Sequence, residues 1–360
     1  MLVDNINYKT IWSTLEKKIN IIDQTYLPFT FKEIEINSLE DAIEAISSMR
    51  VRGAPLIGVT AAYGIYLSTK NSCTNEDLIN VGKKLILTRP TAINLKWAVE
   101  KIISNLLLFP ENQRQELAYG LAEKLAVNDE NINQKIGIYG SEIIEKIFKK
   151  TNKPVNILTH CNAGWLATVD WGTATAPIYK ARDKNIPVHV WVDETRPRNQ
   201  GSFLTSWELK NENIEHTIIA DNAGGHLMQN GLVDIVITGS DRTTYTGDVC
   251  NKIGTYLKAL AAYENNIPFY VALPSSTIDW EIEDGKDINI EERNQDEVHF
   301  IRGLNKNGKI ENFRVTPLDT NASNYSFDVT PRKFISGLIT EFGVYKAAKT
   351  DIIKIKEKLQ

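Results

Sequence analysis

Cysteine and histidine are scarce in this sequence, and neither is spaced as in a metal site. The 360 residues include three cysteines, Cys73, Cys161 and Cys250, which lie far apart. An odd number of distant cysteines argues against a disulfide framework and fits a reducing compartment. The five histidines form no HxxxH pattern and no CxxC pair occurs, so we expect no metal. No Walker loop or GxGxxG sequence follows a predicted strand, which disfavours a nucleotide cofactor.

Long apolar segments and a large excess of one charge are also missing. The chain has no run of about 18 apolar residues, and the N-terminus carries Asp4 without an apolar segment behind it. We therefore expect a cytoplasmic protein with neither a signal peptide nor a membrane span. The formal net charge of -4 gives no global attraction for nucleic acid or for an acidic membrane. A phosphate group would then need a local cluster of basic residues.

The chain is long enough for two domains, or for one large domain with an appendage. Hydrophobic residues make up 42% of it and charged residues 24%, as in ordinary globular proteins with a sizeable core. No repeat or low-complexity linker divides the chain, but its hydrophobic pattern changes near residue 150. We predict a mostly helical N-terminal domain with a short β segment in residues 1–150, and a second domain in residues 151–360.

Residues before 150 show mainly helical periodicity. The segment FTFKEIEI, from Phe29 to Ile36, alternates at the period of a strand. Ser38 follows it and, with Asp41 three residues later, matches a capping box at a helix start. Apolar residues then recur at intervals of three and four, which predicts helices over residues 95–107, 117–125 and 132–147.

After Pro154, short apolar runs alternate with helical stretches. The runs begin at Val155, Val188, His216, Asp234 and Phe269. Because the intervening stretches are long enough for crossover helices, the pattern predicts a Rossmann-like, doubly wound parallel sheet in an α/β protein. Ligands of such sheets bind beyond the carboxyl ends of the strands. The residues that follow each run are therefore the candidates for a functional site.

Two of the predicted strand ends carry residues suited to catalysis. Asp241 follows the apolar run 235–237, and partial burial there would raise its pKa towards neutrality, as a general acid or base requires. An aspartate paired structurally with Arg242 or with a backbone amide is the alternative. Cys161 precedes an Asn-Ala-Gly turn that we expect to lead into a helix, and a helix N-terminus favours the thiolate. A small buried cysteine is the alternative.

Several other residues are candidates for binding an anion. Arg52 and Gly53 precede Ala54 and Pro55, where Pro55 suits the first turn of a helix and Gly53 lets the backbone approach a ligand. A simple turn between helices explains the same residues. Arg89, which stands before a proline, is a further candidate.

Two polar loops supply the remaining candidates. A helix is predicted to open near Cys250, so that Asn251 and Lys252 in its first turn would offer donors to an anion. A solvated lysine is the alternative. The loop of residues 193–201 follows a strongly apolar strand, and its Gln200 is placed to face a ligand.

Nine segments occur in order between about Leu27 and Gly343. They are RGAPLIG from Arg52, RPTAINL from Arg89, LTHCNAG from Leu158, DETRPRNQG from Asp193, GSDR from Gly239, GDVCNKIGTY from Gly247, PFYVALPSSTID from Pro268, IEER from Ile290 and FDVTP from Phe327. Together they resemble the methylthioribose-1-phosphate isomerases. The resemblance implies a helical domain packed on a Rossmann-like domain, and a homodimer.

The same resemblance implies roles for individual residues. Asp241 would be the proton donor and Cys161 the second catalytic residue. Substrate binding would fall to Arg52, Gly53, Ala54, Arg89, Gln200, Asn251 and Lys252. Neither a metal nor another cofactor is implied, and the partner is a small sugar phosphate. Cys250 stands where an alanine is usual, Trp165 follows the CNAG turn, and residues 243–246 differ from the usual run. These departures leave the 5-substituent of the sugar open.

The expected reaction is the conversion of 5-methylthioribose 1-phosphate to 5-methylthioribulose 1-phosphate in methionine salvage. The hydrogen at C2 would move to C1 either as a proton taken by a Cys161 thiolate or as a hydride in a dry pocket. One alternative is the isomerisation of 5-deoxyribose 1-phosphate or ribose 1,5-bisphosphate. Another is a non-catalytic regulatory subunit that senses sugar phosphates or nucleotides, which does not need Cys161 and Asp241 together.

Overall fold

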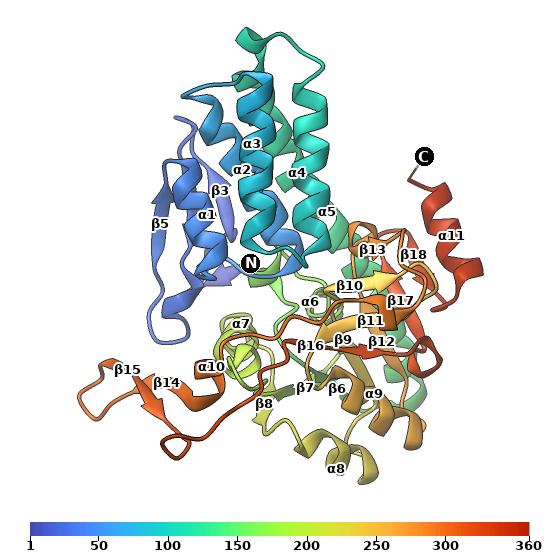
Figure 1. Cartoon of the computed structure of the whole chain (residues 1–360). Helices are drawn as coiled ribbons and strands as arrows, with labels where there is room; N and C mark the ends of the chain where they lie inside the picture. The colour runs from blue at the N-terminus through green and yellow to red at the C-terminus, as the bar shows by residue number, and fades with distance from the viewer. Residues whose placement is uncertain (360) are drawn as a thin grey trace.

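The computed structural model describes residues 1–359 and places a helical N-terminal part on a C-terminal sheet (Figure 1). The N-terminal part opens with a small antiparallel sheet, of which β4 is the central strand. Its strands are β3 (Ile11–Ser13), β4 (Ile19–Ile22) and β5 (Glu33–Ile36). The helices that follow are α1 (Leu39–Ser47), α2 (Ala54–Thr69), α3 (Asn75–Thr88), α4 (Ile93–Leu106) and α5 (Glu111–Thr151). A short hairpin of β1 (Leu2–Val3) and β2 (Ile6–Asn7) precedes the sheet.

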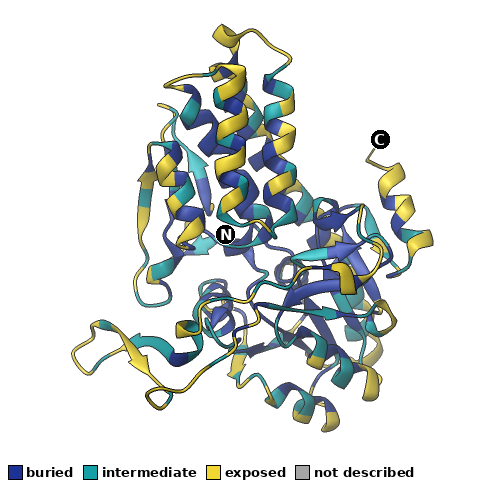
Figure 2. Cartoon of the chain, viewed as in Figure 1, coloured by how far each residue is buried: buried dark blue, intermediate teal, exposed yellow. Residues whose placement is uncertain are grey.

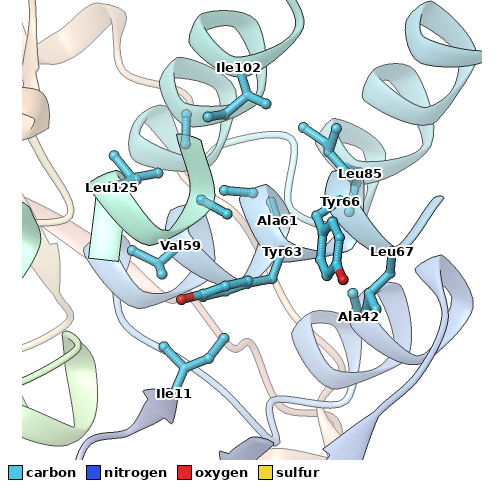
Figure 3. Packing of buried hydrophobic residues seen from close by; sticks show 14 of the residues in the cluster. Ile11, Ala42, Val59, Ala61, Tyr63, Tyr66, Leu67, Leu85, Ile102 and Leu125 are labelled. Carbon is cyan, nitrogen blue, oxygen red and sulfur yellow. The ribbon is translucent and has the colours of Figure 1, made fainter. Parts of the chain in front are cut away.

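The predicted start of α1 is confirmed in detail. Ser38 accepts the N–H of Asp41, and the Asp41 carboxylate accepts the N–H of Ser38, which completes the capping box. Helix α2 lies at the centre of the helical part and buries nearly its whole length. Figure 3 shows Tyr63 and Tyr66 of this helix within the apolar cluster, together with Leu85 and Ile102 from the neighbouring helices. Inward faces are buried and outward faces exposed in the same helices (Figure 2).

One continuous helix replaces two predicted ones. We expected separate helical segments at residues 117–125 and 132–147, but both lie in α5, which runs without a break for 41 residues. No proline or positive-φ residue interrupts the chain between them, so the hydrogen-bond ladder continues. Its second half packs on α6 (Ala176–Asp183), where a Cβ at Gly140 would lie 2.3 Å from the ring of Pro177. The helix therefore joins the two parts of the molecule.

The C-terminal sheet has seven strands in the order β18-β17-β12-β9-β6-β7-β8. All neighbours are parallel except the edge pair of β17 and β18. The strands are β6 (Val155–Thr159), β7 (Val188–Asp193), β8 (His216–Ile219), β9 (Ile235–Thr238), β12 (Phe269–Ala272), β17 (Gly337–Thr340) and β18 (Gly343–Tyr345). The five predicted strands are present, and the predicted Rossmann-like α/β class is confirmed.

The order of the strands reverses between β6 and β9. Strands β7 and β8 extend the sheet on one side of β6, and β9, β12 and β17 extend it on the other. Ile157 of β6 lies between Val190 and Ile235 of its two neighbours. Such a reversal leaves a crevice at the carboxyl ends of the two central strands. The remaining helices of this part are α7 (Ser206–Asn211), α8 (Ala223–Gln229), α9 (Thr255–Glu264) and α11 (Lys349–Glu357).

A second, smaller sheet lies between the helical part and the main sheet, at the level of the strand ends (Figure 1). It is formed by β13 (Ile278–Asp279), β10 (Arg242–Thr244), β11 (Val249–Lys252) and β16 (Phe327–Thr330). The helix predicted to open near Cys250 is wrong, because Cys250 pairs with Arg242 on one side and Val329 on the other. The helix α9 begins only after Gly254.

The last elements form a projection at the edge of the molecule. The short helix α10 (Asp296–His299) leads into a hairpin of β14 (Phe300–Leu304) and β15 (Ile310–Arg314), which extends away from the main sheet in Figure 1. None of the helices within residues 1–359 is both long and apolar enough to cross a membrane.

We propose a domain boundary near residue 150, because α5 ends at Thr151 and β6 begins at Val155. The first residues of the chain nevertheless contact the second domain. The N-terminal ammonium of Met1 lies 2.9 Å from the carboxylate of Asp170. The side chains of Met1 and Val3 belong to the apolar cluster that lies under the main sheet.

A buried carboxyl group of α5 should make stability depend on pH. Asp129 accepts the N–H of Val169 at 2.7 Å, and burial raises the pKa of Asp129 to about 7, compared with about 3.9 in an unfolded chain. Between these values the folded chain holds a proton that the unfolded chain has lost. The free energy of unfolding should therefore fall as pH rises through this window.

We expect Asp129→Asn to remove the contribution of this group to the pH dependence, on the order of 4 kcal/mol between about pH 4 and pH 8. The asparagine oxygen can still accept the Val169 N–H, so the packing is kept. Urea unfolding across this pH range measures the effect, with the exposed substitution Glu100→Gln as the control. An unchanged pH slope in Asp129→Asn would contradict the assignment.

Candidate active site

The two predicted catalytic residues follow the two strands that flank the reversal of strand order. Cys161 lies two residues beyond the end of β6, and Asp241 lies three residues beyond the end of β9. They are close enough for the charge of Asp241 to raise the pKa of the Cys161 thiol. The positive charges of Arg52 and Lys252 act on both groups. The fold thus brings together residues that are 80 positions apart in the sequence.

Cys161 is held in an unusual backbone conformation. Its φ angle is 68°, in the left-handed region that non-glycine residues rarely adopt. The Thr195 hydroxyl accepts its N–H at 2.9 Å, and the Thr205 hydroxyl donates to its carbonyl at 2.8 Å. Two threonine side chains therefore fix the residue on either side of its Cα atom. Strain held in this way is common at functional sites.

The Cys161 thiol is not activated in the way we expected. The Asn-Ala-Gly turn leads only into a 3₁₀ turn, Trp165–Ala167, so the α-helix expected directly after Cys161 is not formed. The residue is 7% exposed, and burial raises the pKa of its thiol more than Arg52 and Lys252 lower it. The pKa of the Cys161 thiol therefore lies above its ordinary value. The expected helix after this turn is wrong, and desolvation outweighs the local positive charge.

Asp241 has the environment of a proton donor. Burial raises the pKa of its carboxyl group, while Lys252, Arg52 and Arg89 act in the opposite direction. The alternative pairing with Arg242 does not occur, because that guanidinium donates to the carbonyl of Thr91 and lies 3.5 Å from Asp279. The Asp241 carboxylate therefore forms no ion pair with Arg242.

The Arg52–Ala54 segment forms the start of α2, as predicted. Gly53 is the N-cap residue with a φ of 105°, and a Cβ at this position would lie 2.5 Å from the backbone of Ala167. Glycine is therefore required where the helical domain meets the loop after β6. The guanidinium of Arg52 reaches into that loop and donates to the side-chain oxygen of Asn162, and to its carbonyl at 2.8 Å.

The remaining predicted cations are buried. Lys252 is the last residue of β11 and is 8% exposed. Burial lowers the pKa of its ammonium, while Cys161 and Asp241 raise it. Arg89 follows α3, where burial lowers its pKa, and its guanidinium lies 4.0 Å from Glu291. Each of these cations therefore lies in surroundings where an anion would be held strongly.

Asn251 and Gln200 differ in how their side chains are engaged. The Asn251 amide donates to the hydroxyl of Thr255 at 3.0 Å, which links β11 to the start of α9. The Gln200 side-chain oxygen is buried and has no hydrogen-bond partner among residues 1–359. A buried acceptor of this kind is costly unless a ligand supplies a donor.

Two cavities are each lined by some of the predicted site residues. One of about 40 Å³ is lined by Gly53, Ala54, Arg89 and Asp241 among others, and also by Cys250. The other, of about 600 Å³, is lined by Arg52 and Gln200, together with apolar side chains such as Met49, Phe203 and Phe300. Since Arg52 and Gly53 are consecutive, the start of α2 separates the two cavities.

The histidine beside Cys161 belongs to a structural network. His160 Nδ1 lies 2.8 Å from Asp193 and Nε2 lies 2.8 Å from the carbonyl of Ile253. Asp221 is close enough for His160, Asp193 and Asp221 to form a possible metal-ligand group. The ammonium of Lys258 lies 3.1 Å from Asp193 and already occupies the place of a cation. We therefore assign this cluster to the packing of strand ends.

Several residues around the site were not identified from the sequence. Thr195 and Thr205 fix Cys161, and Glu208 is fully buried beneath the Asn162–Gly164 turn. An acidic residue directly flanked by two large apolar ones, Trp207 and Leu209, is the one signal that could have drawn attention to Glu208.

The three cysteines should differ in reactivity. Only a thiolate attacks an alkylating reagent, and Cys161 is both buried and raised in pKa. Cys73 is partly exposed. We expect iodoacetamide to modify Cys73 at least about tenfold faster than Cys161 near pH 7, as followed by peptide mass spectrometry. The buried Cys250 serves as an internal reference. Equal rates for Cys73 and Cys161 would indicate an accessible thiolate.

Comparison with known proteins places the chain in a family. A family model described as "Initiation factor 2 subunit family" matches residues 50–347. A methylthioribose-1-phosphate isomerase of Gluconobacter oxydans is 52% identical over 357 residues, which cover 98% of this chain and 97% of the relative.

Two solved structures are similar over nearly their whole length. The 5-methylthioribose 1-phosphate isomerase from Pyrococcus horikoshii has a TM-score of 0.83 and 37% identity, and the match covers 98% of this chain and 97% of that one. A structure described as translation initiation factor eIF-2B, subunit delta, from A. fulgidus has a TM-score of 0.81 and 38% identity, covering 98% of this chain and 100% of that one. The chain therefore belongs to the Initiation factor 2 subunit family, and within it to the group that includes the methylthioribose-1-phosphate isomerases.

Proposed function

We propose that the chain is an aldose–ketose isomerase that converts 5-methylthioribose 1-phosphate to 5-methylthioribulose 1-phosphate, a step of methionine salvage. The observation that carries this proposal is the pairing of Cys161 and Asp241 at the reversal of strand order. The full-length similarity to an isomerase of Gluconobacter oxydans supports the same substrate.

The chemistry requires a proton donor before the hydrogen can move. The anomeric oxygen carries the phosphate, so the sugar ring cannot open to a free aldehyde. We propose that Asp241 protonates the ring oxygen as its bond to C1 breaks. Because burial raises the pKa of Asp241, the protonated form is available at a pH where an ordinary aspartate is ionised.

The structure favours one of the two routes for the hydrogen. A base at C2 would require a Cys161 thiolate, but burial raises the pKa of that thiol. We propose that the hydrogen instead passes from C2 to C1 with its electron pair. The O2–H proton then goes to the Asp241 carboxylate, which leaves a carbonyl at C2. Cys161 would border the reacting carbons and help to exclude water.

The phosphate group is assigned to the buried cations. We propose that Arg52, Arg89 and Lys252 bind the phosphate. Asn251 and Gln200 would contact the sugar. Binding through the phosphate positions the substrate against a small catalytic pair. We further propose a cytoplasmic homodimer that binds neither nucleic acid nor membranes. The resemblance to dimeric isomerases supports the dimer. The net charge of -4 fits a protein that binds neither nucleic acid nor acidic membranes, and the free cysteines fit the cytoplasm.

A regulatory function is the alternative from another class. The similarity to the A. fulgidus protein described as a translation initiation factor subunit favours it. A sensor of sugar phosphates or nucleotides, however, needs neither a proton donor nor a thiol beside it. The presence of both Asp241 and Cys161 in one buried site favours an enzyme.

The substrate assignment predicts a selective activity profile. The purified enzyme should isomerise 5-methylthioribose 1-phosphate with a kcat/KM about tenfold or more above that for 5-deoxyribose 1-phosphate or ribose 1,5-bisphosphate. Product formation is followed by ³¹P NMR. A higher kcat/KM for the bisphosphate would move the assignment to that sugar, and no turnover of any 1-phosphorylated pentose would favour the regulatory function.

The catalytic pair predicts severe but specific losses. Asp241→Asn should lower kcat by about 100- to 10,000-fold because it removes proton transfer, and we expect Cys161→Ser to be similarly severe. Both variants should unfold at temperatures near that of the wild type. Cys73→Ser, which is remote from the site, is the matched control and should keep full activity. Near-normal kcat in either site variant would exclude that residue from the chemistry.

A further inference from the structure

Arg52 is held in place without a carboxylate partner. Among residues 1–359 it forms no ion pair, and both of its recorded hydrogen bonds go to Asn162. The side-chain nitrogen of Asn162 points away from Arg52. This Nδ2 atom donates to Glu208 at 2.9 Å and to the Thr205 hydroxyl at 3.1 Å. One neutral side chain therefore links a guanidinium to a buried carboxylate.

The surroundings of Glu208 are built for a negative charge. The residue is 0% exposed, and each of its carboxylate oxygens accepts two hydrogen bonds. One oxygen accepts from the Asn162 amide and the Leu166 N–H, and the other from the Trp165 N–H and the Tyr179 hydroxyl. Four donors fill the capacity of a carboxylate, and three of them are N–H groups that cannot accept a hydrogen from a protonated acid.

The turn that carries Cys161 is packed directly on this carboxylate. A Cβ at Gly164 would lie 1.8 Å from Glu208, so only glycine fits at that position. The Thr205 hydroxyl, which contacts Asn162, also donates to the Cys161 carbonyl. Glu208 therefore contacts both Asn162, which holds Arg52, and the turn that carries Cys161.

We propose that Glu208 is a positioning residue for phosphate binding, which acts through Asn162 to fix the guanidinium of Arg52. This inference rests on the proposed function only in that the substrate carries a phosphate. The intervening amide matters for charge. A carboxylate in direct contact would pair with Arg52 and compete with phosphate, whereas Asn162 transmits the hydrogen bonds and leaves the positive charge available.

Glu208 can carry its negative charge at moderately alkaline pH although it is buried. Burial raises the pKa of Glu208 to about 7, while the hydrogen bonds and the charge of Arg52 act in the opposite direction. At about pH 8 the carboxylate is therefore mostly ionised and can accept all four hydrogen bonds. Binding measurements belong at that pH, where the proposed contact is complete.

Binding of inorganic phosphate, without turnover, tests the proposal. Isothermal titration calorimetry at about pH 8 compares the wild type with Arg52→Ala, Asn162→Ala and Glu208→Gln. Each substitution should raise the dissociation constant of phosphate about tenfold, the size expected when one charge-assisted hydrogen bond is lost or misaligned. Tyr179→Phe is the matched control. It removes one of the four donors to Glu208 but leaves Asn162 untouched, so it should weaken phosphate binding less than Asn162→Ala does. Glu341→Gln, which neutralises another buried carboxylate that accepts from Ser275, should bind phosphate as the wild type does.

A double variant separates positioning from general loss of structure. If Glu208 acts through Arg52, then Glu208→Gln in the Arg52→Ala background should cause no further loss of phosphate affinity. Losses that multiply, or a Glu208→Gln variant that binds phosphate normally, would overturn the proposal. Should Glu208→Gln fail to fold, Glu208→Asp, whose shorter side chain withdraws the carboxylate from Asn162, takes its place in the same cycle with Arg52→Ala.

The test is independent of the catalytic assignment. A wild type that binds phosphate and shows the predicted coupling, yet isomerises no sugar, contradicts the proposed function and leaves the role of Glu208 intact. A wild type with no measurable affinity for phosphate overturns the positioning role. An active enzyme without the coupling between Glu208 and Arg52 contradicts only the positioning role of Glu208.

Discussion

The site depends on the reversal of strand order between β6 and β9. Because the neighbours of these strands extend the sheet in opposite directions, the chain leaves a crevice at their carboxyl ends. Cys161 and Asp241 meet there only through this topology. The second sheet then brings Lys252 to the same place on β11, and the helical domain adds Arg52 at the start of α2. A single feature of the sheet thus determines where four distant segments converge.

Burial sets the chemical state of the residues that converge. It raises the pKa of both Cys161 and Asp241 and lowers that of Lys252, in each case against the effect of the opposite charges nearby. Desolvation penalises every charged form in such a place, while a bound phosphate would offset the cost for the cations. The protein therefore keeps a thiol that is harder to ionise than a free cysteine, and an acid that is easier to protonate, beside cations that gain most when an anion is present.

Patterns in the sequence predicted correctly those elements that depend on residues close together in the chain. The strands from Val155 and Asp234 are runs of apolar residues, and the capping box at Ser38 is a contact between neighbours in sequence, so both were identified. The assignment of Cys250 to a helix was wrong because pairing with β10 and β16 comes from distant segments. The continuity of α5 across residues 125–132 was likewise missed, because an amphipathic pattern weakens where a helix changes its packing partner.

The environment of Cys161 shows why the chemistry was harder to predict than the positions. Which residues lie at a strand end follows from periodicity, but their protonation depends on how much protein surrounds them. The segment after Cys161 forms only a 3₁₀ turn, so it does not supply the helix dipole that was expected from it. Burial by segments that are distant in sequence therefore decides the state of the thiol. The same reasoning explains Glu208, since an acid with four donors around its carboxylate is recognised only once the turn of Asn162–Gly164 is folded over it.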